Sequence, residues 1–415
     1  MHQRKIIEII ISGSVGELDW ILPIAKYLSE SGRSIRVSFL KKSARESFKN
    51  NSTIRNIASG SLKINEETLL SDSQLKIWEF LNRLYRLLSK ISYKIFFNHL
   101  EKFFSFLNKI FFKRLQKKKK NDPSCVIVEY PSDRRLLGAI LRGNNIKTIY
   151  FPHSPHIYSK ENNQSSEKNF IRKHNKCALE FETYLFGSEN DIHAIIKEGW
   201  SPVKKSKILI TGHPKYSKSW IKYFKDQVDI NSNKESFKIG ILSRGVGNFL
   251  SKQEHERLIE DIHKAITKID KNLEVKVKLH PREVLDVNTS WSNFLSNGFH
   301  LTDDHIFKIF SEVDLIIMMW SSAALDAAIF NIPVIEMYDP NTSFLGQVKR
   351  GNKFNTIYDL SGLVETAKNE KELSDKILEI LNGNKFNLNR SNSVEELINR
   401  SDNWVQIAQD DMAEW

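Results

Sequence analysis

Cysteine is scarce in this sequence. The chain of 415 residues contains two cysteines, Cys125 and Cys177, and they form no CxxC motif or other close pair. A disulfide framework requires several paired cysteines, and a thiolate metal site requires closely spaced ones, so we expect neither. Isolated cysteines are typical of reducing compartments, and we therefore predict a cytoplasmic protein.

Long hydrophobic runs and metal-binding patterns are also missing. The apolar run at residues 6–11 is interrupted by Glu8 and is too short for a signal peptide or a membrane span, so we interpret it as a buried strand. The chain has no DxD motif. Asp303-Asp304-His305 precedes a predicted helix and is typical of its cap, and Asp410-Asp411 lies in the tail. We predict no metal ion and no cofactor.

The composition is that of a globular protein with more than one domain. Hydrophobic residues make up 40% of the chain and charged residues 27%, and the length suffices for two or three domains. Short apolar runs alternate with stretches of helical periodicity, a pattern typical of parallel sheets whose strands are connected by helices. We predict an α/β protein with two Rossmann-like parallel-sheet domains that face each other across a cleft.

The predicted elements fall into two halves. The first domain covers residues 1–215, a hinge covers 216–236, the second domain covers 237–385, and residues 386–415 form a tail that could cross back to the first domain. The predicted strands are residues 5–11, 34–39, 125–128, 147–150, 183–186, 207–210, 274–279 and 313–319, with further strands starting at 238 and 334. The predicted helices are residues 18–29, 134–142, 190–198, 252–269 and 305–311.

Residues 275–335 form the most informative stretch. One strand ends in Lys278-Leu279-His280-Pro281-Arg282-Glu283, and a second runs into Trp320-Ser321-Ser322-Ala323. The serines open a helix whose first backbone N–H groups we expect to be free to bind a phosphate. We expect the helix to end at Asn331-Ile332-Pro333, because proline cannot continue it. This strand–helix–strand unit predicts a nucleotide site.

Positive charge is concentrated in one segment. The net charge is +12, and residues 78–120 hold twelve Lys and Arg against two Glu. Apolar residues recur there at helical spacing, and seven phenylalanines lie between Phe96 and Phe112. A basic amphipathic helix with an aromatic face is typical of a surface that binds anionic lipid headgroups. The insertion at residues 74–120 is therefore predicted to contact a membrane.

A plainer alternative is that these aromatic side chains pack on the first domain and the lysines only solvate it. Helical stripes of this kind are most often part of a core. Nucleic acid is a weaker third possibility, because no recognition motif accompanies the charge. We predict no nucleic-acid partner.

Two sets of motifs resemble a known group of enzymes. Lys278-Leu279-His280-Pro281 and Ser321-Ser322-x-x-Leu325-Asp326, with Pro333 beyond, are similar to the His-Pro and Ser-Ser motifs of bacterial GT-B glycosyltransferases that use cytidine-activated donors. That group includes Kdo transferases, polysialyltransferases and capsule enzymes, and CDP-glycerol glycerophosphotransferases are its relatives. Residues 14–25, with Gly16 and Glu17, resemble the Kdo-transferase loop that carries the catalytic base. The motifs are short, but the resemblance covers the framework of both halves.

The resemblance implies a metal-independent glycosyltransferase. Its donor would be a CMP-activated sugar, similar to Kdo or a sialic acid, and its acceptor a surface polysaccharide or a lipid-linked glycan. A monophosphate donor needs less countercharge than a diphosphate, which agrees with the missing metal motif. The implied location is cytoplasmic, peripherally associated with the inner membrane, in capsule or lipopolysaccharide biosynthesis.

The implied donor site lies in the second half. Departure of the nucleotide needs positive charge at its phosphate, which His280, Arg244 and the helix after the serines would provide. The predicted donor-binding residues are Ser243, Arg244, Lys278, His280, Pro281, Arg282, Ser321 and Ser322. A plainer alternative makes His280 an ordinary strand-end histidine and the two serines a helix cap.

The implied acceptor site lies in the first half. Glu17 would be the base that takes the proton of the acceptor hydroxyl, and Gly16 and His153 would line the site. The alternative for Glu17 is a carboxylate that caps the start of a helix. Glu129 and Asp133 are reserve candidates for the base. Gly212-His213-Pro214, which also follows a strand, we interpret as a structural turn.

Other functions stay open. The chain could be a CDP-glycerol-type polyol-phosphate transferase. It could also be a catalytically silent GT-B-like protein that binds a membrane or a glycan-assembly partner through residues 78–120. A nucleotide-sugar epimerase of GT-B type is a further alternative, and the identity of the nucleotide base would separate cytidine users from uridine users.

Overall fold

The computed structural model divides the chain into two compact units. The first holds the described residues up to Lys215 together with those from Arg400 onward, and the second holds Tyr216–Asn399. The structure describes residues 6–91, 125–129, 147–151, 183–192, 207–226, 236–247, 250–280, 283, 291, 298–341, 348–350, 352–384, 386, 390 and 392–406. In this part of the chain no helix is long and apolar enough to cross a membrane.

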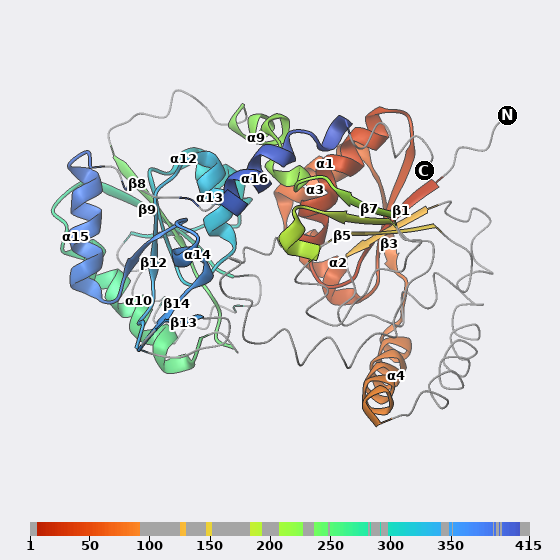
Figure 1. The fold of residues 1–415 in the computed structure, drawn as a ribbon, viewed down its shortest axis with the longest axis horizontal. Coiled ribbons are helices and arrows are strands. Elements are labelled where there is room, and N and C mark those ends of the chain that lie inside the picture. Colours follow the sequence, from red (N-terminus) through yellow and green to blue (C-terminus); the bar gives the residue numbers. More distant parts are fainter. Residues whose placement is uncertain are drawn as a thin grey trace. The chain divides into compact units, whose positions relative to one another are not determined.

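The first unit is built on a seven-stranded sheet in the order β3-β2-β1-β4-β5-β6-β7. Figure 1 labels β1, β3, β5 and β7 of this sheet. All neighbouring strands are parallel. Its strands are β1 (Ile6–Ile11), β2 (Ser34–Phe39), β3 (Lys63–Thr68), β4 (Cys125–Glu129), β5 (Lys147–Phe151), β6 (Thr183–Phe186) and β7 (Lys207–Ile210). Its helices are α1 (Val15–Glu30), α2 (Lys42–Lys49), α3 (Ser52–Ser61) and α4 (Asp72–Ile91).

One buried ion pair explains the glutamate inside the first strand. Glu8 is 1% exposed and pairs across the sheet with Arg36 at 2.9 Å. The hydroxyl of Ser38 donates a second hydrogen bond to Glu8 at 2.6 Å. A buried carboxylate is tolerated when a charge and a hydrogen bond compensate it, so β1 keeps the burial of a central strand.

The second unit is built on a six-stranded parallel sheet in the order β10-β9-β8-β11-β12-β15. Its strands are β8 (Phe237–Leu242), β9 (Leu273–Lys278), β10 (His300–Leu301), β11 (Leu315–Met318), β12 (Val334–Met337) and β15 (Glu365–Ala367), besides the hairpin of β13 (Val348–Arg350) and β14 (Lys353–Asn355). Its helices are α9 (Lys218–Lys225), α10 (Lys252–Thr267), α12 (Ile306–Glu312), α13 (Ala323–Phe330), α14 (Ile357–Leu360) and α15 (Glu370–Leu381).

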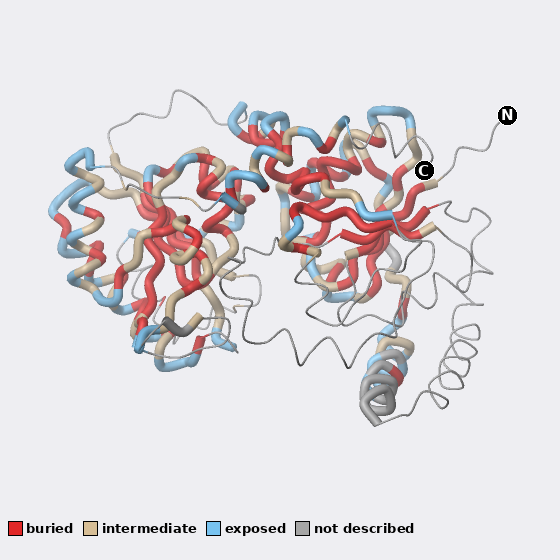
Figure 2. The backbone as a smooth tube through the Cα atoms, in the orientation of Figure 1, coloured by how far each residue is buried: buried red, intermediate tan, exposed pale blue. Residues whose placement is uncertain are grey.

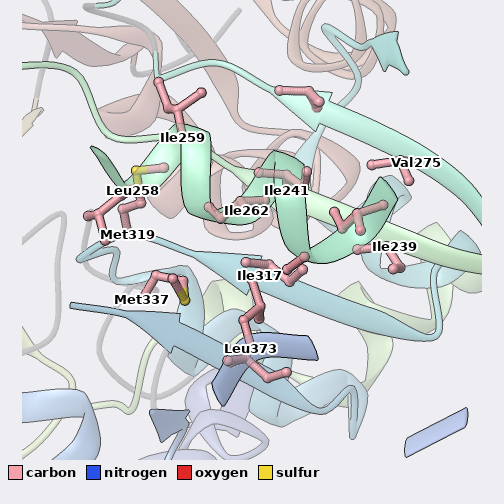
Figure 3. Close-up of a cluster of buried hydrophobic side chains, with 14 of the residues drawn as sticks. Ile239, Ile241, Leu258, Ile259, Ile262, Val275, Ile317, Met319, Met337 and Leu373 are labelled. Carbon is pink, nitrogen blue, oxygen red and sulfur yellow. The ribbon is translucent and has the colours of Figure 1, made fainter. Parts of the chain in front are cut away.

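The strands carry the hydrophobic core. Figure 2 shows buried residues concentrated along the strands of each unit, while α15 exposes its outer face. In the second unit, side chains of α10 pack on those of β8, β9 and β11 together with Leu373 of α15 (Figure 3). Strands buried on both faces are typical of parallel sheets covered by helices, as the apolar runs predicted.

Chain segments near residue 215 and near the C-terminus are ordered by packing. The predicted hinge contains α9, whose Phe224 ring stacks on His305 at 4.7 Å between ring centroids. α16 (Asn392–Ser401) leads into Trp404, which packs edge-on against Tyr27 at 5.5 Å. Gly212, with φ of +68°, lies so close to Ser401 that an added Cβ would come within 2.3 Å of its backbone nitrogen. Only glycine fits this position.

The structure confirms the fold class and most of the predicted elements. The strands predicted at 34–39, 183–186 and 207–210 match β2, β6 and β7, and the ends of the other predicted strands differ from the structure by at most two residues. The sequence did not predict β3, β13, β14 or β15. Residues 92–120 of the basic segment and the helix predicted at 134–142 lie outside the described residues. The cleft between the domains stays a prediction.

Candidate functional site

The order of the strands in each sheet points to one place for a ligand. In the second unit the chain runs from β8 outward through β9 to β10, then returns to the other side of β8 with β11 and continues outward to β12. The point where the direction reverses lies between the carboxyl ends of β8 and β11. Ligands of open parallel sheets bind at such a switch point. In the first unit the equivalent point lies between β1 and β4.

Arg244 ties the two strands at the switch point of the second unit. It follows β8, and its Nη1 donates to the main-chain oxygen of Trp320, just beyond β11, at 3.2 Å. Trp320 has φ of +36°, a conformation that is strained for a bulky residue. Its ring is buried and lies 5.5 Å from that of Tyr358. The turn that leads into α13 is therefore held by contacts on both sides.

The start of α13 differs from the expectation. The N–H of Ala323 donates to the Ser321 hydroxyl at 3.2 Å, and the N–H groups of Ala324 and Leu325 donate to the carbonyls of Ser321 and Ser322. These three N–H groups are used within a tight first turn, so the expectation that they are free was wrong. Among the described residues, the N–H groups of Ser321 and Ser322 have no such partner, so they are the candidate phosphate donors of this turn.

The C-terminal end of α13 agrees with the prediction. The helix ends at Phe330, and Asn331 follows in the left-handed conformation with φ of 58°. The asparagine N–H donates to the carbonyls of Ala327 and Ala328. Asparagine is one of the few residues that favour this conformation, and Pro333 comes two residues later.

Ser243 and Lys278 are placed at the same sheet edge but are engaged with protein groups. The Ser243 hydroxyl donates to Glu283 Oε2 at 2.6 Å, and a hydroxyl has one proton to donate. Lys278 Nζ donates to the main-chain oxygen of Asp304 at 2.7 Å. Both side chains thus connect loops in this structure rather than present a donor to a phosphate.

His280 lies at the end of β9, beside the end of β8, as predicted. It is half-buried, and its N–H donates to Glu283 Oε2 at 3.3 Å. Pro281, Arg282 and His153 lie outside the described residues. The residue that sequence reasoning missed is Glu283, which receives hydrogen bonds from several elements. Its spacing from His280, with proline between them, is the signal of a β-turn that could have drawn attention to it.

Glu17 lies at the switch point of the first unit, and both of its carboxylate oxygens accept hydrogen bonds from the loop before it. Its carboxylate is 2% exposed. Oε2 accepts hydrogen bonds from the N–H and hydroxyl of Ser12, and Oε1 accepts them from the N–H groups of Gly13 and Ser14. Four donors satisfy a carboxylate. The structure therefore shows Glu17 in the capping role that was the alternative to catalysis, and Gly16 follows within the first turn of α1.

Glu129 occupies a more open position at the same switch point. It is the last residue of β4, in the strand that pairs with β1, and it is half-buried. Of the two reserve candidates for the base, Glu129 is the one that the structure describes. Asp133 lies outside the described residues.

Glu336 is a buried acid beside the Trp320 turn. It lies in β12, is fully buried, and accepts a hydrogen bond from Thr356 Oγ1 at 2.5 Å. Burial raises the pKa of Glu336 to about 8, while the hydroxyl of Thr356 lowers it, Asp359 raises it and the Trp320 N–H lowers it. At neutral pH this side chain is therefore mostly a neutral acid.

Metal ligands do not gather within the described ranges. No group of three or more His, Cys, Asp or Glu residues there has the geometry to hold a metal ion. Among the described residues, Arg244 and Lys278 bring positive charge to this edge of the sheet.

Comparison with known proteins reveals similarity of fold. No protein-family model matches the chain, and no curated protein matches it in sequence. UDP-GlcNAc 2-epimerase from Neisseria meningitidis bound to UDP-GlcNAc has a TM-score of 0.56 at 12% identity, over 99% of this chain and 100% of that one. UDP-GlcNAc 2-epimerase from Methanocaldococcus jannaschii in complex with UDP-GlcNAc and UDP has a TM-score of 0.53 at 14% identity. The match covers 97% of this chain and 99% of that one. S. aureus MnaA with UDP has a TM-score of 0.51 at 12% identity, and the match covers 96% of this chain and 91% of that one.

This is the GT-B fold. The two parallel sheets of seven and six strands and the likeness over nearly the whole chain establish it. The resemblance to GT-B proteins that the motifs suggested is thereby confirmed at the level of fold. The cytidine-dependent group within that fold stays a prediction.

The capping role of Glu17 predicts a loss of stability in Glu17→Gln. The amide keeps one acceptor oxygen and places an NH2 group against N–H donors, so we expect the free energy of unfolding to fall by about 1–3 kcal/mol. Glu30→Gln, at the exposed end of the same helix, is the matched control and should change it by less than about 0.5 kcal/mol. Urea denaturation measures both, and a Glu17→Gln variant as stable as the wild type would contradict the capping role.

The raised pKa of Glu336 predicts a pH dependence of stability. The folded protein keeps this proton up to a pH of about 8, whereas the unfolded chain releases it near 4.5. The contribution is fully present below pH 4.5 and is lost as the pH rises through about 8, with a slope of up to about 1.4 kcal/mol per pH unit. Glu336→Gln should remove this part of the slope. Parallel stability curves for the two proteins, measured by urea denaturation between these pH values, would contradict it.

Proposed function

We propose that the protein is a glycosyltransferase that binds a nucleotide-activated sugar at the switch point of its second unit. The observation that supports this most directly is the convergence of Arg244, the Ser321-Ser322 turn and His280 at neighbouring strand ends of one parallel sheet. Each is a group that binds anions, and the fold's neighbours carry UDP or UDP-GlcNAc. Binding of a nucleotide phosphate is the common explanation.

In the proposed reaction the second unit stabilises the departing nucleotide. As the bond between the sugar and the phosphate breaks, negative charge grows on the phosphate oxygens. The Arg244 guanidinium, the N–H groups of Ser321 and Ser322, and the ring of His280 would stabilise that charge. No step in this scheme uses a metal ion or a cofactor.

The first unit would supply the base that activates the acceptor hydroxyl. Glu17 could act only after giving up some of its four hydrogen bonds, whereas Glu129 lies at the same switch point and is half-buried. Catalytic contacts often form only in the substrate complex, so both carboxylates stay in the proposal, with Glu129 preferred. Gly16 and His153 are the proposed acceptor-side residues.

The donor we propose is a CMP-activated sugar, similar to Kdo or a sialic acid, passed to a polysaccharide or lipid-linked glycan. This choice rests on the His280-Pro281 and Ser321-Ser322 motifs. A CDP-glycerol-type polyol-phosphate transferase and a catalytically silent binding protein are the alternatives with the same site.

A nucleotide-sugar epimerase is the second candidate function. The specific observation in its favour is the likeness of the whole chain to three structures that carry UDP or UDP-GlcNAc, two of them UDP-GlcNAc 2-epimerases. An epimerase needs no acceptor, so conversion of UDP-GlcNAc without any second substrate separates it from a transferase.

Nucleotide selectivity tests the proposal. Thermal unfolding with CMP, CDP, UMP, UDP and GDP should show selective stabilisation by CMP, because a ligand that binds the folded state raises Tm by mass action. His280→Ala should lose most of that shift. Leu378→Ala, on the exposed face of α15, is the control and should respond like the wild type.

Each other result of this experiment changes the assignment. Selective stabilisation by CDP would favour the polyol-phosphate transferase, and stabilisation by UDP would favour the epimerase or another uridine enzyme. No response to any nucleotide would contradict a nucleotide-dependent function and favour the silent binding protein.

We also propose that α4 and the basic segment that follows it bind an anionic membrane. Two apolar side chains of α4 are exposed on one face, Ile77 at 46% and Phe80 at 63%. Lys76 and Arg83, both exposed, lie next to Phe80 at helical spacing. Apolar side chains flanked by cations match the interface of an anionic bilayer.

Vesicle binding tests this surface. The wild type should sediment with vesicles that contain phosphatidylglycerol and should stay in solution with phosphatidylcholine alone. Phe80→Ser should reduce the bound fraction several-fold, because each exposed apolar side chain adds to insertion. Leu378→Ser, which removes an exposed leucine from α15, should bind like the wild type. Equal binding by both variants would contradict a role for α4.

A further inference from the structure

Glu283 receives hydrogen bonds from four groups on different segments of the second unit. Oε2 accepts from the hydroxyl of Ser243 at 2.6 Å and from the N–H of His280 at 3.3 Å. Oε1 accepts from His255 Nε2 at 3.0 Å and from Trp291 Nε1 at 2.9 Å. One oxygen thus holds the two strand ends of the candidate site, and the other is anchored to α10 and to the buried Trp291.

These contacts favour the ionised form of Glu283. Burial acts to raise its pKa, but the hydrogen bonds from His255, Ser243 and Trp291 together lower the pKa below its ordinary value. A carboxylate with four donors has its acceptor sites filled. It therefore has no oxygen to spare for a substrate, and it acts through the groups that it holds.

The arrangement is not that of a nucleophilic triad. In such a triad the histidine lies between the hydroxyl and the acid, so that it can take the hydroxyl proton. Here the acid lies between Ser243 and His255, and both donate to it. Activation of the Ser243 hydroxyl by His255 is therefore excluded in this geometry.

Glu283 also closes a turn at the end of β9. Its N–H donates to the carbonyl of His280 at 2.8 Å, the bond of a β-turn from the first to the fourth residue. The sequence has proline at the second position of this turn, which favours it. His280 is thus bound to Glu283 through both its N–H and its carbonyl group, and its direction depends on that residue.

We propose that Glu283 is a positioning residue of the donor site, which holds His280 beside the end of β8 in the arrangement that receives the nucleotide phosphate. This inference rests on the proposed function, since it assigns a role within the same site. Glu283 touches no reacting atom. It joins the ends of β8 and β9, which are also linked by the hydrogen bond from the Ser243 N–H to the Lys278 carbonyl.

Glu283→Gln is a sharp test because only some of the groups that donate to Glu283 can also accept a hydrogen bond. The Ser243 hydroxyl can accept a hydrogen bond, and His255 can do so in its other tautomer, but the His280 N–H and Trp291 Nε1–H can only donate. Whichever way the amide turns, its NH2 group meets one of these two. We expect it to displace the His280 turn, because the Trp291 side is buried and less able to move.

The expected result is a loss of nucleotide affinity in a folded protein. Isothermal titration with the nucleotide that stabilises the wild type should give a Kd at least about tenfold higher for Glu283→Gln. Ile262→Val, a core substitution in α10 at a side chain labelled in Figure 3, is the control for a general loss of stability and should keep the wild-type Kd. Hydrogen exchange at the His280 amide should become faster in Glu283→Gln alone.

A double-mutant cycle separates positioning from simple destabilisation. If Glu283 acts through His280, then Glu283→Gln combined with His280→Ala should bind no more weakly than His280→Ala by itself. Additive losses would overturn the positioning role, as would a wild-type Kd with unchanged exchange at His280. A wild type that binds none of the five nucleotides would overturn the proposed function, and the role of Glu283 with it.

Discussion

The structure depends on one constraint, which is that every pair of neighbouring strands in the two large sheets is parallel. Parallel strands have all their carboxyl ends at one edge, and the helices that connect them cover both faces. Polar side chains that follow the strands are therefore gathered at that edge, even when they are far apart in sequence. Arg244 and Trp320 meet in this way, although 76 positions separate them in the sequence.

Buried carboxylates at these edges are held in different ways. Glu17 and Glu283 each receive hydrogen bonds from four donors, which shape the loops around them, and in Glu283 these bonds lower the pKa of the carboxyl group. Glu336 is fully buried and has two donors, the Thr356 hydroxyl and the Trp320 N–H, and burial raises its pKa instead. A carboxylate in the interior must be satisfied by donors or lose its charge. The loops beside both switch points thus depend on acids that do not themselves need to touch a substrate.

The fold leaves the reaction open. Two of the structures with this fold are UDP-GlcNAc 2-epimerases, and one fold hosts many reactions, so the reaction is decided by the site and not by the fold. In the proposed scheme a transferase and an epimerase differ in the first unit, where a transferase needs a base for an acceptor hydroxyl. The structure moves attention from Glu17, whose oxygens are satisfied, to Glu129, which ends the neighbouring strand.

The sequence by itself determined the two parallel-sheet domains, because short apolar runs with helical stretches between them allow few other arrangements. It also placed His280, Arg244 and the serines of α13 at strand ends, since proline and small polar residues end these elements locally. Only the tertiary structure decided which groups are engaged. The carboxylate of Glu17 accepts hydrogen bonds from its own loop, and Ser243 and Lys278 donate to protein groups. Glu283 accepts hydrogen bonds from four parts of the chain. The hydrogen bonds of Ser243, Lys278 and Glu283 depend on distances between segments that are separate in the sequence, and no local pattern of residues encodes those distances.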